Sequence, residues 1–206
     1  MTSADGAAAA RLVITAAGRW QAARPGGLVV AVDGHGGAGK STIAAAVAQA
    51  TGAALVHTDD FFLQPRVPAP GPPPSEQPPV PASLAEYYDW RRMRTEALGP
   101  LRAGRHATFR RFDWERGTGP SGTVTVRPAA LIVLEGVFSA APELSDLVNR
   151  FVFVDTPEPE RLRRLHARLT PGEWDSDWLI AEQAYFGVVR SPSSFDLVVS
   201  GTSVSA

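Results

Sequence analysis

The stretch GHGGAGKS, residues 34–41, constrains this chain more than any other feature of its sequence. It fits the pattern G-x-x-x-x-G-K-[ST] of a Walker A phosphate loop. A short apolar run, LVVAVD at 28–33, precedes it, and an alanine-rich segment with helical spacing follows it and ends at Gly52. A buried strand, a glycine-rich turn and a helix are the setting that such a loop requires. The sequence therefore predicts an α/β chain with a nucleotide site at this turn.

The loop residues have distinct expected roles. Its glycines would turn the backbone with positive φ and bring N–H groups around a β-phosphate, at the positive end of the following helix. Lys40 would reach the β- and γ-oxygens, and Ser41 would ligate Mg²⁺. His35 lies at a variable position, and we expect no role for it. The residues predicted to bind the nucleotide are Gly34, Gly36, Gly37, Ala38, Gly39, Lys40, Ser41 and Thr42.

Further strands and helices alternate along the chain. Apolar runs predict strands at 53–57, 130–136, 150–155 and 195–200, and helical spacing indicates helices at 7–23, near 143–148, at 158–169 and at 174–187. Residues 107–114 and 122–128 suggest a hairpin. Because no second domain boundary is visible in 206 residues, we expect one domain, 1–206, with residues 1–10 frayed.

Proline punctuates the middle of the chain. Residues 65–81 contain nine of the 18 prolines, which excludes helix and central strand, so we expect a stiff loop there. Helical spacing resumes after it, with Ser83 as a candidate N-cap and Glu86 in the position of a capping box.

Composition excludes some partners. The 20 basic and 21 acidic residues give a net charge of −1, so nothing in the overall charge attracts nucleic acid or a membrane surface. The chain has no cysteine, no apparent export signal and no long apolar span, which fits the cytoplasm. Whether it forms a homo-oligomer is left open.

Carboxylates follow two of the predicted strands. Glu135 ends the run LIVLE, and a carboxylate at that strand tip is placed to hold Mg²⁺ directly or through water. Asp59 and Asp60 follow the strand at 53–57, where an acidic residue could accept the proton of an attacking hydroxyl. They could instead cap a short helix.

Four motifs in order resemble the uridine kinase and phosphoribulokinase group of P-loop kinases, which includes pantothenate kinase. They are DGHGGAGKST, DDFF about 20 residues later, LEG, and FVDTPEPERLRRLHAR. The resemblance runs from about Val29 to Arg168. It implies a three-layer P-loop NTPase fold with a central, mostly parallel sheet, helices on both faces, and a short lid at about 169–178.

The resemblance also assigns site residues. It implies that Asp59 activates the acceptor hydroxyl, and that Arg161, Arg164 and Arg168, on one face of a helix, contact the triphosphate. The family's nucleoside-binding tyrosine is replaced here by Phe112. The segment EYYDWRR resembles a part of the family that contacts the acceptor, although its aromatic residues could equally pack in the core. The candidate acceptor residues are Asp60, Phe62, Tyr88, Asp89, Arg92, Arg111 and Phe112.

The sequence thus predicts an ATP- and Mg²⁺-dependent kinase that phosphorylates a hydroxyl of a small molecule. The acceptor would be a nucleoside or another alcohol, such as one like pantothenate or a sugar. A nucleotide-dependent switch protein is the alternative from another class.

Overall fold

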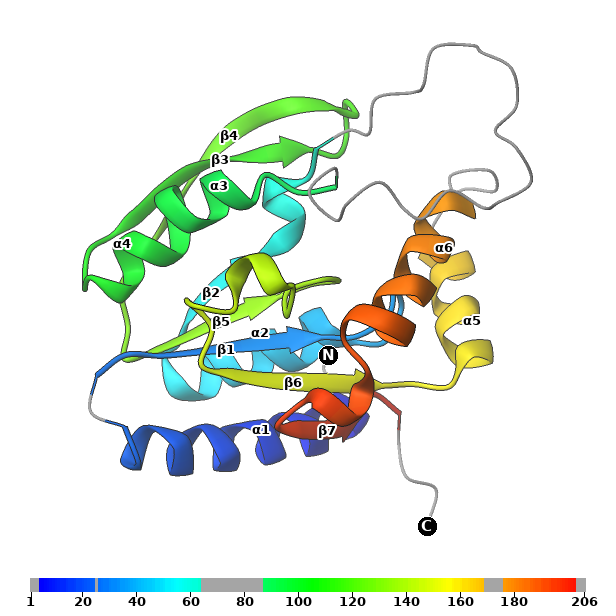
Figure 1. Ribbon diagram of the computed structural model, residues 1–206, viewed down its shortest axis with the longest axis horizontal. Helices are drawn as coiled ribbons and strands as arrows, with labels where there is room; N and C mark the ends of the chain where they lie inside the picture. Colours follow the sequence, from blue (N-terminus) through cyan, green and yellow to red (C-terminus); the bar gives the residue numbers. More distant parts are fainter. Residues whose placement is uncertain (1–3, 25, 64–86, 169–175, 203–206) are drawn as a thin grey trace.

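The computed structural model describes residues 4–24, 26–63, 87–168 and 176–202, and it has a parallel sheet at its centre (Figure 1). The strand order is β2-β5-β1-β6-β7, with every neighbouring pair parallel. Its members are β1 (Leu28–Asp33), β2 (Ala54–His57), β5 (Leu131–Glu135), β6 (Arg150–Asp155) and β7 (Leu197–Ser200). The phosphate-loop strand β1 is therefore central, and β5 with Glu135 lies beside it, as predicted.

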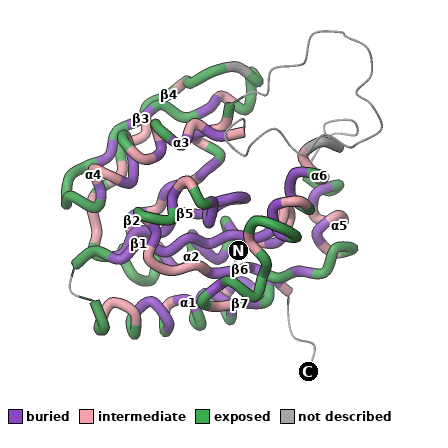
Figure 2. Tube along the Cα trace, viewed as in Figure 1, coloured by how far each residue is buried: buried purple, intermediate pink, exposed green. Residues whose placement is uncertain are grey.

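Helices cover both faces of this sheet, because its strands are apolar on both sides. Every residue of β1 is buried. Val30 and Val32 pack into a core with α1 (Ala4–Ala22) and α2 (Lys40–Thr51). Val29 and Ala31 point to the other core, which contains the helical residues 90–102 and α6 (Ser176–Ala184). Figure 2 shows the buried strands between the partly exposed helices.

The remaining elements are short. The stretch at 90–102 comprises α3 (Trp90–Arg92), a π-helical turn (Met93–Leu98) and α4 (Gly99–Arg102). The helix α5 (Glu158–Arg168) follows β6, and α6 continues as a π-helical turn, Tyr185–Val189. Single 3-10 turns lie at Thr58–Phe61, Pro142–Leu144 and Pro192–Ser194. Outside the main sheet, β3 (Ala107–Asp113) and β4 (Thr118–Val126) form the predicted hairpin.

Two helix predictions are wrong in extent. The helix predicted near 143–148 is a 3-10 turn at Pro142–Leu144, which is followed by a single turn in which the N–H groups of Leu147 and Val148 both donate to the Leu144 carbonyl. The helix predicted from Ser83 begins at Trp90 among the described residues. Tyr88 forms a β-bridge with Phe62, which keeps the backbone before Asp89 extended. Ser83, Glu86, the proline-rich segment 65–81 and lid residues 169–175 lie outside the described residues.

The N-terminal helix begins earlier than predicted. We expected residues 1–10 to be frayed, yet α1 starts at Ala4. Ala9 and Ala10 are buried at 3% exposure each, and α1 packs against α2. Small side chains allow the two helices to approach closely, which stabilises this first turn. Among the helices of the described residues, none combines the length and apolarity needed to cross a membrane.

Candidate functional site

The phosphate loop joins the carboxyl end of β1 to the first turn of α2. Gly37 and Gly39 have φ of 75° and 98°, values that disfavour residues with a Cβ. A Cβ on Gly37 would lie 2.6 Å from the Arg161 carbonyl oxygen. The prediction that all four glycines have positive φ is wrong for Gly36. A Cβ at that position would instead lie 3.1 Å from Glu182 Oε1, so Gly36 allows a carboxylate to approach the loop.

Two polar side chains at the end of the loop have partners within the protein. Lys40 is buried, and its Nζ donates to the His35 carbonyl at 2.9 Å. Ser41 Oγ donates to Glu135 Oε2 at 3.1 Å. Glu135 is 4% exposed, and its register partner on β1 is Val32. The structure thus brings Ser41 of the loop into contact with Glu135, 94 positions later in the chain.

Ser41 and Glu135 place a hydroxyl and a carboxylate oxygen side by side, 3.1 Å apart. Both are oxygen ligands of the kind that Mg²⁺ prefers, so the chemistry of these two side chains fits the ion. The described residues contain no group of three or more His, Cys, Asp or Glu suited to a metal. These two residues therefore fit an ion that takes most of its ligands from phosphates and water, as Mg²⁺ does in P-loop proteins.

Asp59 is an exposed residue of the 3-10 turn that follows β2, and hydrogen bonds hold both its carboxyl group and its backbone carbonyl. Tyr88 Oη donates to Asp59 Oδ1 at 3.1 Å, and Trp114 Nε1 donates to its carbonyl oxygen at 3.3 Å. The surrounding protein atoms, with the charge of Glu135, raise the pKa of Asp59, while the charge of Lys40 opposes the shift. The register of the sheet agrees with this, because Asp59 comes two residues after His57, which is paired with Glu135. The neighbouring Asp60 also has a raised pKa, chiefly from desolvation.

An aromatic cluster lies beside Asp59. The Phe62 ring is 5.2 Å from Phe112, 4.9 Å from Trp114 and 6.2 Å from Trp178. Trp114 is 57% exposed, whereas Phe112 is 6% exposed. The predicted acceptor residues Phe62 and Phe112 are therefore brought together with two tryptophans that the sequence did not single out.

Three other predicted acceptor residues have partners within the protein. Tyr88 is 1% exposed, so it supports Asp59 through its hydroxyl and does not offer a stacking face. Asp89 Oδ1 accepts from the Arg92 backbone N–H at 2.9 Å and caps α3. Arg92 forms an ion pair with Glu96 and donates to the Arg110 carbonyl, which ties α3 to the hairpin.

Arg111 remains near the site. It is exposed, and its charge lowers the pKa of Asp60 against the larger effect of desolvation.

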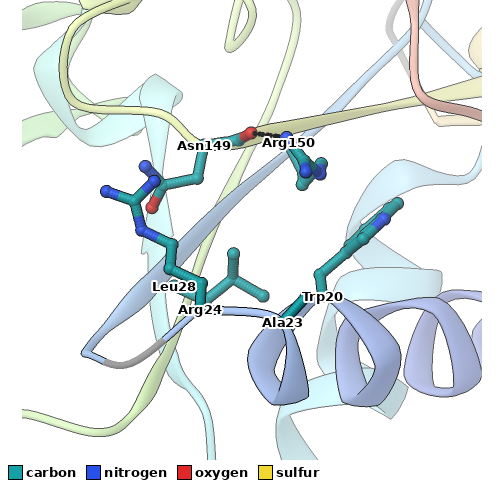
Figure 3. Close-up of a pocket in the computed structure, with 6 residues that line it drawn as sticks. All are labelled: Trp20, Ala23, Arg24, Leu28, Asn149 and Arg150. Atoms are coloured by element: carbon teal, nitrogen blue, oxygen red, sulfur yellow. Dashed lines mark hydrogen bonds between the residues drawn. The ribbon is translucent and has the colours of Figure 1, made fainter.

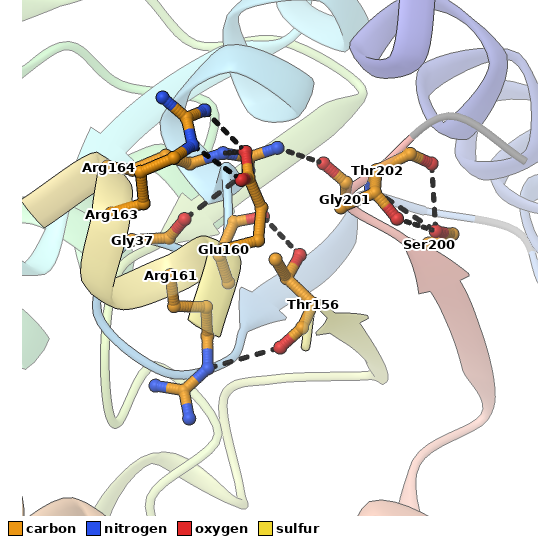
Figure 4. Close-up of polar contacts among 10 residues, drawn as sticks. Gly37, Thr156, Glu160, Arg161, Arg163, Arg164, Ser200, Gly201 and Thr202 are labelled. Carbon is orange, nitrogen blue, oxygen red and sulfur yellow. Dashed lines mark hydrogen bonds and ion pairs between the residues drawn. The ribbon is translucent and has the colours of Figure 1, made fainter. Parts of the chain in front are cut away.

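The arginines of α5 contact the backbone around the phosphate loop (Figure 4). Arg161 is 9% exposed and donates to the Thr156 carbonyl at 3.1 Å. Arg164 donates to the Gly37 carbonyl at 3.3 Å and to the Gly201 carbonyl at 3.0 Å. Both guanidinium groups are thus already engaged with carbonyl oxygens, and their predicted role in gripping a triphosphate stays a prediction. Arg168, the last residue of α5, is exposed.

Glu182 is a site residue that the sequence analysis missed. Its carboxylate is buried and accepts from the Gly36 backbone N–H at 3.0 Å, from His35 Nδ1 at 3.1 Å and from Trp178 Nε1 at 2.6 Å. Burial raises the pKa of Glu182, but the hydrogen bond from His35 and the charge of Lys40 outweigh it, and the net shift is downward. An ionised carboxylate on α6 therefore holds the start of the phosphate loop.

The same contact places His35, for which we expected no role: its Nδ1 lies 3.1 Å from Glu182, and its ring lies 4.3 Å from that of Phe186. A lone Glu182 in the apolar segment WLIAEQAYF was the available signal.

Asp33 was also missed, and it organises the backbone behind the loop. Its Oδ1 accepts from the backbone N–H groups of Gly34 and Phe138, at 2.7 and 3.0 Å. Its Oδ2 accepts from the Ala140 N–H and from Tyr185 Oη, both at 2.9 Å. Complete burial raises the pKa of Asp33 to about 6. One side chain thus joins β1, the segment after β5 and the helical turn after α6.

A cavity of about 180 Å³ lies apart from this site, between the end of α1 and the starts of β1 and β6 (Figure 3). Its lining includes Leu28, the first residue of β1, and Arg150, the first residue of β6. The phosphate loop follows the last residue of β1. The cavity is therefore at the opposite end of the parallel strands from Lys40 and Glu135.

Comparison with known proteins agrees with the motifs. No protein-family model matches the chain. A uridine kinase from Halobacterium salinarum is 26% identical over 143 residues, which cover 66% of this chain and 59% of that protein. The chain thus spans less than two thirds of this relative's length.

Solved structures share the fold. One, named "a Possible Uridine Kinase" and from Bacillus stearothermophilus, has a TM-score of 0.67 at 19% sequence identity. The alignment covers 93% of this chain and 97% of the Bacillus chain. A "putative fructose transport system kinase" from Silicibacter sp. TM1040 has a TM-score of 0.59 at 22% identity, with 92% and 98% covered. The resemblance and the fold class predicted from the sequence are confirmed: the chain is similar in sequence to a uridine kinase, and it shares the parallel α/β fold of these solved structures.

Proposed function

We propose that this uridine kinase-like chain transfers the γ-phosphate of ATP to a hydroxyl group of a small molecule, with Mg²⁺. The observation that carries the proposal is the position of Asp59. This exposed residue accepts a hydrogen bond from Tyr88, and it follows β2, whose last residue is paired with Glu135 on β5. A base for the acceptor hydroxyl thus lies next to the groups expected to hold the donor phosphates.

Each side chain has a defined task. The loop N–H groups and Lys40 bind the phosphates, and Lys40 offsets the charge that develops on the γ-phosphoryl group during transfer. Ser41 and Glu135 hold Mg²⁺, which neutralises phosphate charge when it is bound. Asp59 accepts the hydroxyl proton and orients the attacking oxygen. Phe62 and Trp114 contact a flat or apolar part of the acceptor, as a nucleoside base would provide.

The chain's lysine content gives a direct test of nucleotide binding. Lys40 is the only lysine in the sequence. An acyl phosphate of ATP, which acylates a lysine near the bound phosphates, should therefore modify Lys40, as read by mass spectrometry, and excess ATP should prevent the modification. Lys40→Arg is the matched control, since it keeps the charge but has no amine to acylate. Absence of labelling at Lys40 would overturn the donor site.

The acceptor is tested by screening for ADP release. Uridine, cytidine, pantothenate and simple sugars cover the two kinds of alcohol that the sequence leaves open. We expect at least one class to be turned over above the rate in buffer. Asp59→Asn should lower kcat by about 10²- to 10⁴-fold and leave ATP affinity unchanged. Tyr88→Phe removes only the hydroxyl group that donates to Asp59, so it should lower kcat less. An active Asp59→Asn variant would contradict the role of this base.

The alternative is a nucleotide-dependent switch. A GTP-binding switch would carry an N-K-x-D segment, and the only lysine of this sequence lies in the phosphate loop. Preferential protection of Lys40 by GTP, together with hydrolysis that a protein partner stimulates, would favour the switch and count against the kinase.

A further inference from the structure

His57, the last residue of β2, contacts the carboxylate that the proposed function assigns to Mg²⁺. Its Nδ1 lies 2.5 Å from Glu135 Oε1, while Glu135 Oε2 accepts from Ser41 Oγ at 3.1 Å. The two carboxylate oxygens therefore have different partners. One is occupied by the imidazole, and the other faces the phosphate loop.

The sheet register produces this contact. His57 and Glu135 are paired residues on the parallel strands β2 and β5, and each is the last residue of its strand. Glu135 is almost fully buried, whereas the His57 side chain is 43% exposed. Because the carboxylate offers only lone pairs, the imidazole must be the donor, so Nδ1 carries the hydrogen in either charge state of the ring.

We propose that His57 is a positioning residue for the magnesium-binding carboxylate. The terminal torsion of a glutamate side chain is broad, so an unsupported carboxylate loses rotational freedom when it binds an ion. The Nδ1–H bond to Oε1 removes that freedom in advance and leaves Oε2 directed to Ser41. Hydrogen bonds to a ligating carboxylate typically contribute 10- to 100-fold to metal affinity. This inference rests on the proposed function, because it takes Ser41 and Glu135 as the cation ligands.

The test measures metal binding without turnover. Mn²⁺ replaces Mg²⁺, and free Mn²⁺ is followed by electron paramagnetic resonance with the full chain and a non-hydrolysable imido analogue of ATP. We expect His57→Ala to weaken Mn²⁺ binding to the protein–nucleotide complex by about tenfold or more. His57→Asn should restore most of the affinity, because the asparagine Nδ2 can occupy the place of the imidazole Nδ1. His106→Ala, at an exposed histidine before β3, is the matched control and should bind Mn²⁺ like the wild type.

Three results would overturn the inference. His57→Ala could bind Mn²⁺ as tightly as the wild type, or more tightly, which would mean that the imidazole competes with the ion. His57→Asn could bind as weakly as His57→Ala, which would exclude the hydrogen bond as the cause. Glu135→Gln could bind like the wild type, which would remove Glu135 from the metal site. If the Mn²⁺ results hold but no alcohol is phosphorylated, the positioning role stands and the kinase proposal fails.

Discussion

The donor and acceptor halves of the candidate site are built in different ways. The donor half consists of the phosphate loop with Glu135 and Glu182, and buried carboxylates hold it through backbone N–H groups and a hydroxyl. The acceptor half consists of Asp59, Tyr88 and the rings of Phe62, Phe112, Trp114 and Trp178, which come from four parts of the chain. The donor half thus depends on the backbone of one short loop and its carboxylate partners, whereas the acceptor half depends on the packing of side chains from distant segments.

The largest effect is expected from the removal of Lys40, whose ammonium group is the only one in the donor half. Lys40→Ala should lower phosphoryl transfer on the order of 1000-fold, because the charge that develops on the γ-phosphoryl group is then unopposed. Turnover of the acceptor found in the ADP-release screen measures this. The acceptor KM should not change if the two halves are independent. A large change in that KM would show that Lys40 also organises the acceptor half.

The next effect concerns the stability of the donor half. The pKa of Asp33 is about 6 in the folded chain against an ordinary value of 3.8, so the folded state binds this proton more tightly than the unfolded state. The contribution of Asp33 to the free energy of unfolding is therefore fully present below pH 3.8, and it is lost as the pH rises through 6. Across that window the loss amounts to at most roughly 3 kcal/mol.

Asp33→Asn removes this titration and is therefore the test. Urea unfolding of the wild type and the variant between pH 4.5 and 7.5 should show the wild type losing its advantage as the pH rises. Asp155→Asn is the matched control, since Asp155 is exposed at the end of the neighbouring strand β6. The same pH dependence in both variants would contradict the assignment to Asp33.

A smaller effect is expected where α6 meets the phosphate loop. Glu182→Gln replaces an ionised acceptor by an amide, whose N–H groups would oppose the N–H of Gly36 or of His35. We expect ATP binding to weaken about tenfold, measured by calorimetry, with Glu158→Gln on the exposed start of α5 as the control. If affinity for ATP rises instead, Glu182 acts as an internal competitor of the phosphates and not as a support for the loop.

The sequence predicted the donor half because its signals are local. Lys40 and Ser41 belong to one eight-residue pattern, and Glu135 ends an apolar run that can only be a buried strand. Glu182 escaped because it acts on His35 from 147 positions away, and no pattern in a single sequence reports such a pairing. The burial of Tyr88 could not be predicted, since it depends on how the segment after the proline-rich stretch returns to Phe62.

The acceptor half offers the smallest change, at Trp114. This side chain is 57% exposed, its ring lies 4.9 Å from those of Phe62 and Phe112, and its indole N–H donates to the Asp59 carbonyl. Trp114→Ala removes both the ring and the donor, so the acceptor KM should rise about 3- to 10-fold, in line with the energy of an aromatic contact. Trp114→Phe keeps a ring without the N–H, and it separates stacking from the support of Asp59. Steady-state kinetics with both substrates varied would contradict the division into two halves if the KM for ATP rose while that for the acceptor stayed constant.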